Sequence, residues 1–252
     1  MSTVEGYCDT RFEQIRDVLT ASLDSGEDLG ASVAVVADGA MAVDLWGGWA
    51  DTARTLPWTE HTLTNVWSTT KTMTSLSALV LVDRGDLDLE APVATYWPEF
   101  AANGKSNISV RALLGHTSGV SGWAHPVSVE DMYDWDKSTA MLAAQPPWWE
   151  PGTASGYHAL NQGHLVGEVI RRITGRQLGQ FFADEIAGPL QADFHIGIAP
   201  EGERRISNVV PPPPLPFDLA TLDPDGPCYK TFTGPAVEAN VAWTSDWRRA
   251  DI

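Results

Sequence analysis

The chain has 252 residues, enough for one large domain or two small ones with a sizeable buried core. Hydrophobic residues make up 43% and charged residues 19% of the sequence, a composition that argues against a disordered chain. The formal net charge is -17, and so negative a surface repels the phosphates of nucleic acids and anionic membranes, so we expect neither as a partner.

Two further features bear on the compartment. The segment MSTVEGYCDTRF at the N-terminus lacks the basic and apolar regions of a signal peptide, and no run of residues is apolar enough to span a membrane. We therefore expect a cytoplasmic location. Cys8 and Cys228 are then expected to be free thiols, although a disulfide between them stays open; neither lies in a CxxC pair that would suggest a zinc site.

The first predicted element is a helix over residues 10–25. Thr10 and Glu13 have the spacing of a capping box at its start. Apolar side chains then recur on one helical face, namely Phe12, Ile15, Val18, Leu19 and Leu23.

A β-hairpin is predicted next. Residues 31–37 and 40–46 are apolar runs separated by Asp38-Gly39, a pair that favours a two-residue turn because both turn positions need a positive φ. Two strands do not make a stable sheet by themselves. We therefore expect further strands within 194–245, or a sheet completed by residues outside this sequence.

The remainder is expected to be mainly helical, beginning with a helix over residues 68–83 that stops at Gly85. Its predicted apolar face consists of Met73, Leu76, Leu79 and Val80. Further helices are predicted at 109–114, 160–173 and 177–186. The four prolines at 211–214 indicate polyproline backbone, and we expect residues 200–235 to form a long surface excursion.

One tetrapeptide carries a chemical signal. Ser68-Thr69-Thr70-Lys71 is the only place where a serine precedes a lysine by three residues, and positions i and i+3 share one face of a helix. A serine hydroxyl needs a base to become a nucleophile, and a lysine can be that base when burial or a positive field lowers its pKa. The helix N-terminus supplies free N–H groups for an oxyanion, and Trp67 would help to exclude water.

Other catalytic signatures are missing from the sequence. It contains no G-x-S-x-G, which excludes the nucleophile elbow of α/β-hydrolases, and neither H-E-x-x-H nor G-x-G-x-x-G. The serine–lysine pair is therefore the candidate that remains.

The surroundings of this pair resemble a known family. Residues 67–71, the apolar helix after them and residues 84–89 resemble the nucleophile helix of the serine β-lactamase and penicillin-binding-protein family, with its esterase branch as the closest match. Other segments resemble later family motifs in the same order: Leu113–Gly119 (the LLxHTSG segment), Trp149–Gly152 and Gly156–Ala159. The resemblance runs from about residue 30 to 195.

The resemblance implies a fold, a reaction and three catalytic residues. It implies an α/β (α+β) β-lactamase-like fold, a single domain over residues 1–252 in which an antiparallel sheet is flanked by helices beside a helical region. Ser68 would be the acylated nucleophile, Lys71 its base and Tyr157 the second proton carrier. The implied reaction is the hydrolysis of a small carboxylic ester through an acyl-enzyme, which needs neither a metal nor an organic cofactor.

The sequence departs from the family pattern in two ways. Ala159 stands where β-lactamase members often have the Asn of Tyr-x-Asn, which favours an esterase over a β-lactamase. No K-T-G or H-x-G strand follows Tyr157. We therefore interpret the chain as an incomplete N-terminal portion that lacks the C-terminal sheet strands, to be completed by a missing segment or by a second chain.

Several side chains near the motifs are candidates for substrate contact: Trp67, Trp123, Trp149 and His158. The alternative for the tryptophans is packing in the core or at its rim. A polar supporting role is the alternative for His158, and His116 is expected to fix its own loop. Rival functions are those of a β-lactamase, a D-amino-acid peptidase, an acyltransferase of the same family or a non-catalytic binding homologue.

Overall fold

The computed structural model of the chain contains two compact units. It describes every residue except 1–2, 125, 211–220, 238 and 251–252. The first unit consists of the described residues within 1–65, 199–212 and 239–245. The second unit consists of those within 66–198, 213–238 and 246–252. None of the helices in the described residues is long and apolar enough to cross a membrane.

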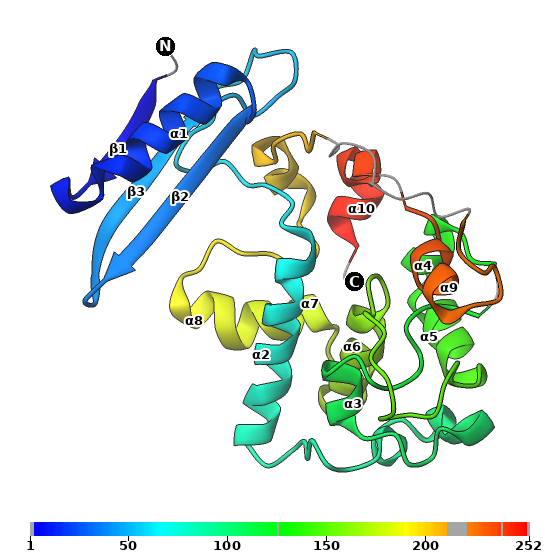
Figure 1. The fold of residues 1–252 in the computed structure, drawn as a ribbon. Helices are drawn as coiled ribbons and strands as arrows, with labels where there is room; N and C mark the ends of the chain where they lie inside the picture. Colours follow the sequence, from blue (N-terminus) through cyan, green and yellow to red (C-terminus); the bar gives the residue numbers. More distant parts are fainter. Residues whose placement is uncertain (1–2, 125, 211–220, 238, 251–252) are drawn as a thin grey trace. The chain divides into compact units, whose positions relative to one another are not determined.

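The first unit is a three-stranded antiparallel sheet with one α-helix on it. The strands are β1 (Val4–Cys8), β2 (Gly30–Ala37) and β3 (Ala40–Gly48), in the spatial order β1-β3-β2. Helix α1 (Glu13–Ser25), which follows a 3₁₀ turn at Thr10–Phe12, lies along the sheet (Figure 1). Its Leu19 and Leu23 are buried together with Val43 and Leu45 of β3.

The predicted hairpin is confirmed. Asp38 and Gly39 have φ values of 52° and 78°, and Ala37 pairs with Ala40 across the turn. Two positive φ angles match the right-handed twist of the flanking strands, which explains why Asp-Gly occupies this turn.

The third strand of the sheet comes from the N-terminus. β1 pairs with β3 from Val4 opposite Gly47 to Cys8 opposite Val43. Gly6 interrupts this short run, with a φ of 100° and its Cα so close to the Asp44 carbonyl that a Cβ would collide with it, so the strand gives little sequence signal. In the described part of 194–245 no strand joins the sheet, so the first of the two alternatives, further strands in that range, is not met there.

The start of the first helix also differs from the prediction. The side chain of Asp9, rather than Thr10, caps it by accepting a hydrogen bond from the Arg11 N–H at 2.9 Å. Val18 was expected on the buried face but is 69% exposed. The amphipathic helix itself is confirmed, with Leu19 and Leu23 facing the sheet.

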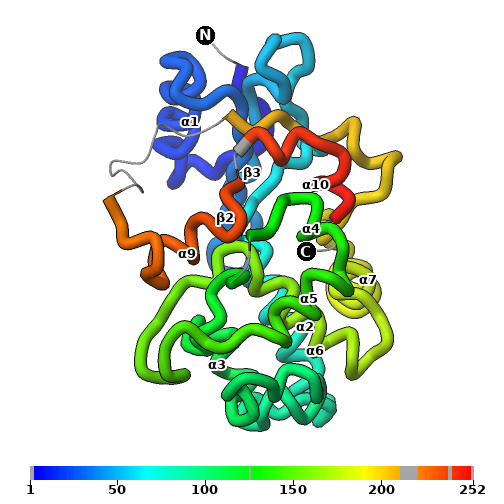
Figure 2. Tube along the Cα trace, turned by 90° about the vertical axis from the view of Figure 1, so that its right-hand side faces the viewer, coloured from blue at the N-terminus to red at the C-terminus, as the bar shows by residue number. Residues whose placement is uncertain are grey.

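The second unit is helical. Its elements, in chain order, are the 3₁₀ turn Trp67–Thr69, α2 (Thr70–Asp83), the 3₁₀ segments Val93–Thr95 and Pro98–Gly104, α3 (Val110–Leu114), α4 (Val129–Tyr133), α5 (Trp135–Ala144), α6 (Gln162–Thr174), α7 (Leu178–Phe182), a π turn (Ala183–Ala187), α8 (Gly188–Leu190), α9 (Pro227–Thr233) and, from Asp246 on, α10 (Ser245–Arg249). Helix α6 packs against α2, α3, α5 and α7, which makes it the central element of the core (Figure 2).

The predicted apolar face of α2 is confirmed in part, because Met73 and Val80 pack against the core whereas the two leucines do not. Leu76 and Leu79 are 40% and 47% exposed. The buried positions are instead Thr74, Ser77, Ala78 and Leu81. Small side chains such as Ser77 and Ala78 let neighbouring helices approach closely, and α2 packs against both α6 and α7, so packing overrides the leucine pattern.

The predicted excursion over 200–235 is only partly described, because its proline run falls in 211–220, outside the described residues. The described ends contain a 3₁₀ segment at Pro200–Arg205 and α9. Thr231 of α9 is buried, and its hydroxyl lies 2.6 Å from that of Ser121. The expectation of free thiols is confirmed for Cys8 and Cys228.

The orientation of α2 can be tested by a matched pair of substitutions. Leu81→Ala should lower the free energy of unfolding by about 2–5 kcal/mol because it leaves a cavity in the core. Leu76→Ala, five residues earlier on the same helix, should cost less than about 1 kcal/mol because its side chain is already exposed in this chain. Urea unfolding measures both changes, and equal losses would contradict the orientation.

Candidate active site

The first turn of the helix α2 region carries the candidate nucleophile. Trp67 has a φ of 47°, a conformation that a bulky residue adopts rarely and that tends to occur at functional sites. Ser68 follows in the 3₁₀ turn that leads into α2 and is exposed. The backbone therefore bends sharply just before the serine and leaves its hydroxyl accessible.

Lys71 lies one turn along, and its amine joins two parts of the site. Lys71 Nζ donates to Ser68 Oγ at 3.2 Å and to the backbone carbonyl of Ala159 at 2.8 Å. Burial lowers the pKa of Lys71 below its usual value, while the neighbouring Tyr157 acts in the opposite direction and raises it. An amine whose pKa is lowered is better able to accept a proton near neutral pH.

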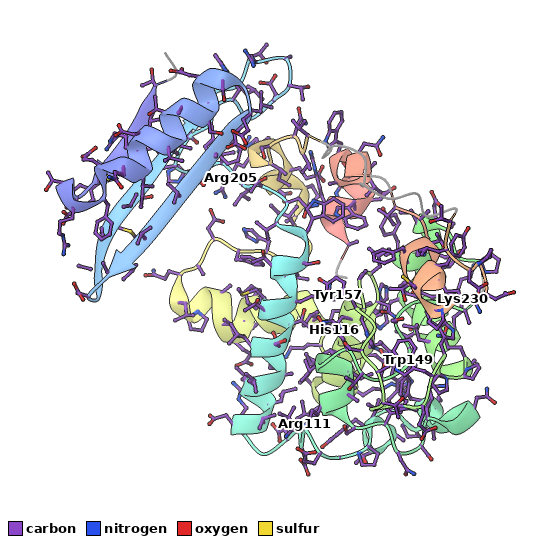
Figure 3. The ribbon with its side chains drawn as sticks, in the orientation of Figure 1. Arg111, His116, Trp149, Tyr157, Arg205 and Lys230 are labelled. Carbon is purple, nitrogen blue, oxygen red and sulfur yellow. The ribbon has the colours of Figure 1, made fainter. Side chains whose placement is uncertain are left out.

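Tyr157 lies beside this amine. Lys71 Nζ is 4.9 Å from the centroid of the Tyr157 ring. The ring centroids of His116 and Tyr157 are 4.8 Å apart, and Figure 3 shows these two residues near each other. Tyr157 is 44% exposed, so its ring is accessible from solvent as well as packed against protein. The structure thus brings Ser68, Lys71 and Tyr157 together from two segments that are distant in sequence.

The segment that carries Tyr157 is attached to the turn at residues 116–118. The Gly156 N–H donates to the His116 carbonyl at 2.9 Å, and the His158 N–H donates to His116 Nδ1 at 3.1 Å. His158 is fully buried, with its Nε2 2.6 Å from Ser118 Oγ. Burial lowers the pKa of His158 to about 4, so its ring is neutral at neutral pH.

The predicted substrate contacts divide into two groups. Trp67 and Trp149 are half-buried; Trp67 packs against Trp247 at 5.3 Å between ring centroids, and Trp149 donates its indole N–H to the Ala154 carbonyl. Trp123 is 2% exposed and donates to the Ser138 carbonyl in the core, and His158 is fully enclosed. Burial favours the packing alternative for Trp123 and the supporting alternative for His158.

Three contributors were not assigned to the site from the sequence. They are the rings of His116 and Trp247 and the carbonyl of Ala159. His116 does stand in the LLGHTSG segment, and its φ of 60° is one that histidine tolerates better than most residues, so its position held a signal. No sequence motif or unusual backbone angle marks Trp247 or the Ala159 carbonyl as part of the site.

Comparisons with known proteins identify the family of this chain. The family model described as Beta-lactamase matches residues 15–241. The Esterase/beta-lactamase LipL of Mycobacterium tuberculosis is 37% identical over 219 residues, which are 86% of this chain and 50% of LipL. A crystal structure of a family VIII carboxylesterase superposes with a TM-score of 0.90 and 41% identity over 98% of this chain and 66% of that chain.

Esterase EstB of Burkholderia gladioli is a further relative, 32% identical over 162 residues, which cover 57% of this chain and 40% of EstB. The chain therefore belongs to the β-lactamase family and has the β-lactamase-like α/β fold. It spans half or less of the length of these two curated relatives.

Two buried histidines make stability depend on pH. Burial lowers the pKa of both His158 and His164 to about 4, whereas an unfolded histidine titrates near 6.5. The unfolded chain therefore binds more protons between these values, and the free energy of unfolding should fall as the pH drops from about 6.5 to 4, by about 3 kcal/mol per histidine.

Urea unfolding at several pH values measures this slope. The variant His164→Asn removes one of the two titrating groups and should flatten the slope. His61→Asn, at a surface position, should leave the slope unchanged and serves as the control. A slope equally steep in His164→Asn would contradict the assignment of a neutral buried imidazole.

Proposed function

We propose that this protein is a serine hydrolase that cleaves small carboxylic esters through an acyl-enzyme at Ser68. The observation that carries the proposal is the position of Lys71 Nζ, 3.2 Å from Ser68 Oγ and beside the Tyr157 ring. A hydroxyl with an amine in hydrogen-bond reach and a phenol beside that amine is the arrangement that proton transfer during acylation requires.

The proposed reaction uses these groups in sequence. Lys71 takes the proton of Ser68 as Oγ attacks the ester carbonyl, and the backbone N–H of Ser68 helps to hold the oxyanion. The C–O bond breaks, and Tyr157 delivers a proton to the departing alcohol. Tyr157 then accepts a proton from the water that attacks the acyl-enzyme. The bond from the acyl carbon to Ser68 Oγ breaks, and Lys71 returns its proton to Ser68.

An ester is favoured over a β-lactam for a structural reason. Position 159 has an alanine, whose side chain offers no hydrogen bond to an amide, while its carbonyl already binds Lys71. The name of LipL combines esterase and β-lactamase, which makes β-lactam hydrolysis the second candidate. We propose Trp67 and Trp149, which keep exposed surface, as the contacts for an apolar acyl group.

Substitutions at the three residues test the mechanism. Ser68→Ala and Lys71→Ala should each lower turnover of p-nitrophenyl butyrate by about 1,000-fold or more, because each removes a group that acts on the reacting bond. Tyr157→Phe should reduce turnover as well, with little change in the far-ultraviolet circular dichroism spectrum.

Covalent labelling separates catalysis from binding. A fluorophosphonate should label the parent chain and the control Thr72→Ala, a hydroxyl on the exposed side of α2, but should not label Ser68→Ala. Labelling that persists in Ser68→Ala would refute the nucleophile, and an unlabelled parent would support a non-catalytic homologue. Faster cleavage of a chromogenic cephalosporin or a D-alanyl peptide than of the ester would replace the esterase with a rival activity.

We also propose that a further C-terminal segment or a second chain completes the fold. Within the described residues no strand pairs with the outer side of either edge strand, β1 or β2, and separately Leu76 and Leu79 of α2 are exposed. Apolar side chains and unpaired strand edges are usually covered. Mass spectrometry of the native protein and its co-purifying chains tests this. Full esterase turnover by a native polypeptide of 27.3 kDa without a partner would contradict it.

A further inference from the structure

A serine–histidine pair also lies in the helical unit, apart from Ser68 and Lys71, but it cannot reach a substrate. Ser118 Oγ and His158 Nε2 are 2.6 Å apart, and both residues are fully buried. The Val120 N–H donates to Ser118 Oγ at 3.1 Å, so the hydroxyl proton is available to His158 Nε2. His158 Nδ1 then donates to the Gly156 carbonyl at 2.7 Å. Each polar atom of the pair has a partner, so the pair is a rigid connection.

This connection extends through His116. The backbone N–H of His158 donates to His116 Nδ1 at 3.1 Å, and the Gly156 N–H donates to the His116 carbonyl at 2.9 Å. The residues on both sides of Tyr157 are therefore held by the turn at residues 116–118. A side chain whose two neighbours are fixed has few backbone conformations left to it.

The ring of His116 adds a third constraint. It packs against the Tyr157 ring at 4.8 Å between centroids and 58° between planes, while Lys71 Nζ lies 4.9 Å from the centroid of the same ring. Burial, followed by the charge of Lys71, lowers the pKa of His116, which keeps its ring neutral and its Nδ1 free to accept at neutral pH. The groups that face it are Tyr157, His158 and Lys71.

We propose that His116 is a positioning residue that fixes the phenol of Tyr157 beside Lys71, and that it acts through the hydrogen bond its Nδ1 accepts from the His158 backbone. The importance of this position for turnover rests on the proposed function, whereas the ordering of Tyr157 does not. His116 makes no contact with the reacting atoms in this scheme; it sets where the phenol lies.

Two substitutions separate the accepting atom from the rest of the residue. His116 has a φ of 60°, which glycine and asparagine tolerate better than other residues, so both variants suit the backbone. In His116→Asn the side-chain oxygen takes the place of Nδ1 and can accept from His158. In His116→Gly no acceptor remains. Both variants lose the imidazole ring, so a difference between their measured properties is due to the presence or absence of the hydrogen-bond acceptor.

The first measurement is ¹⁹F nuclear magnetic resonance of 3-fluorotyrosine placed at position 157, which needs no turnover. We expect one narrow resonance in the parent and in His116→Asn, and a broadened or divided resonance in His116→Gly. The second measurement is ester hydrolysis: His116→Gly should lose up to about 100-fold in kcat with little change in KM, because a misplaced proton donor slows chemistry more than binding. His116→Asn should recover most of that loss.

The outcomes are distinguishable. If the resonance is equally narrow in both variants, or if both lose the same kcat, the hydrogen bond does not position Tyr157 and the proposal is overturned. A thermal melt of each variant identifies unfolding; if His116→Gly does not fold, His116→Ala, which also lacks the acceptor, takes its place in the comparison with His116→Asn. If Tyr157→Phe keeps full turnover, the proposed function fails while the ¹⁹F result still tests the positioning.

Discussion

The site depends on one amine side chain with two oxygen partners. Lys71 Nζ donates to the hydroxyl of Ser68, in the turn that leads into α2, and to the carbonyl of Ala159, 88 residues after Lys71. The same amine lies by the ring of Tyr157. A single amine therefore connects the turn that precedes α2 with the segment that carries the phenol, and the chemistry we propose needs these two parts to lie close together.

The electrostatics of this amine involve a balance. Burial favours its neutral form, whereas Tyr157 favours the charged form, and burial is the larger of the two influences. Burial first, and then the charge of Lys71, lowers the pKa of the neighbouring His116 below its usual value. Burial is therefore the main influence on both groups.

The sequence predicted the local parts of this structure well and the packed parts less well. The Asp38-Gly39 turn and the i,i+3 relation of Ser68 and Lys71 depend on a few neighbouring residues, and both occur as predicted. The approach of Tyr157 could be expected from family resemblance, since no local rule joins residues so far apart.

The errors have a common cause in tertiary packing. Leu76 and Leu79 follow a helical period, yet α6 and α7 pack on the side of α2 with smaller residues. The strand β1 forms by pairing with β3, and the residues of β1 alone do not predict a strand. Trp123 stands between two motifs in sequence, but its side chain turns into the core, and sequence proximity could not show that direction.

The partner of Lys71 at position 159 is a main-chain carbonyl, and every amino acid supplies one. The residue type at 159 is therefore free to vary without removing the acceptor that anchors the amine. An ancestor or descendant of this chain could exchange alanine for asparagine there and offer a new hydrogen bond to an incoming molecule. A change of residue type at position 159 would then alter the contact with substrate and would keep the main-chain acceptor for Lys71.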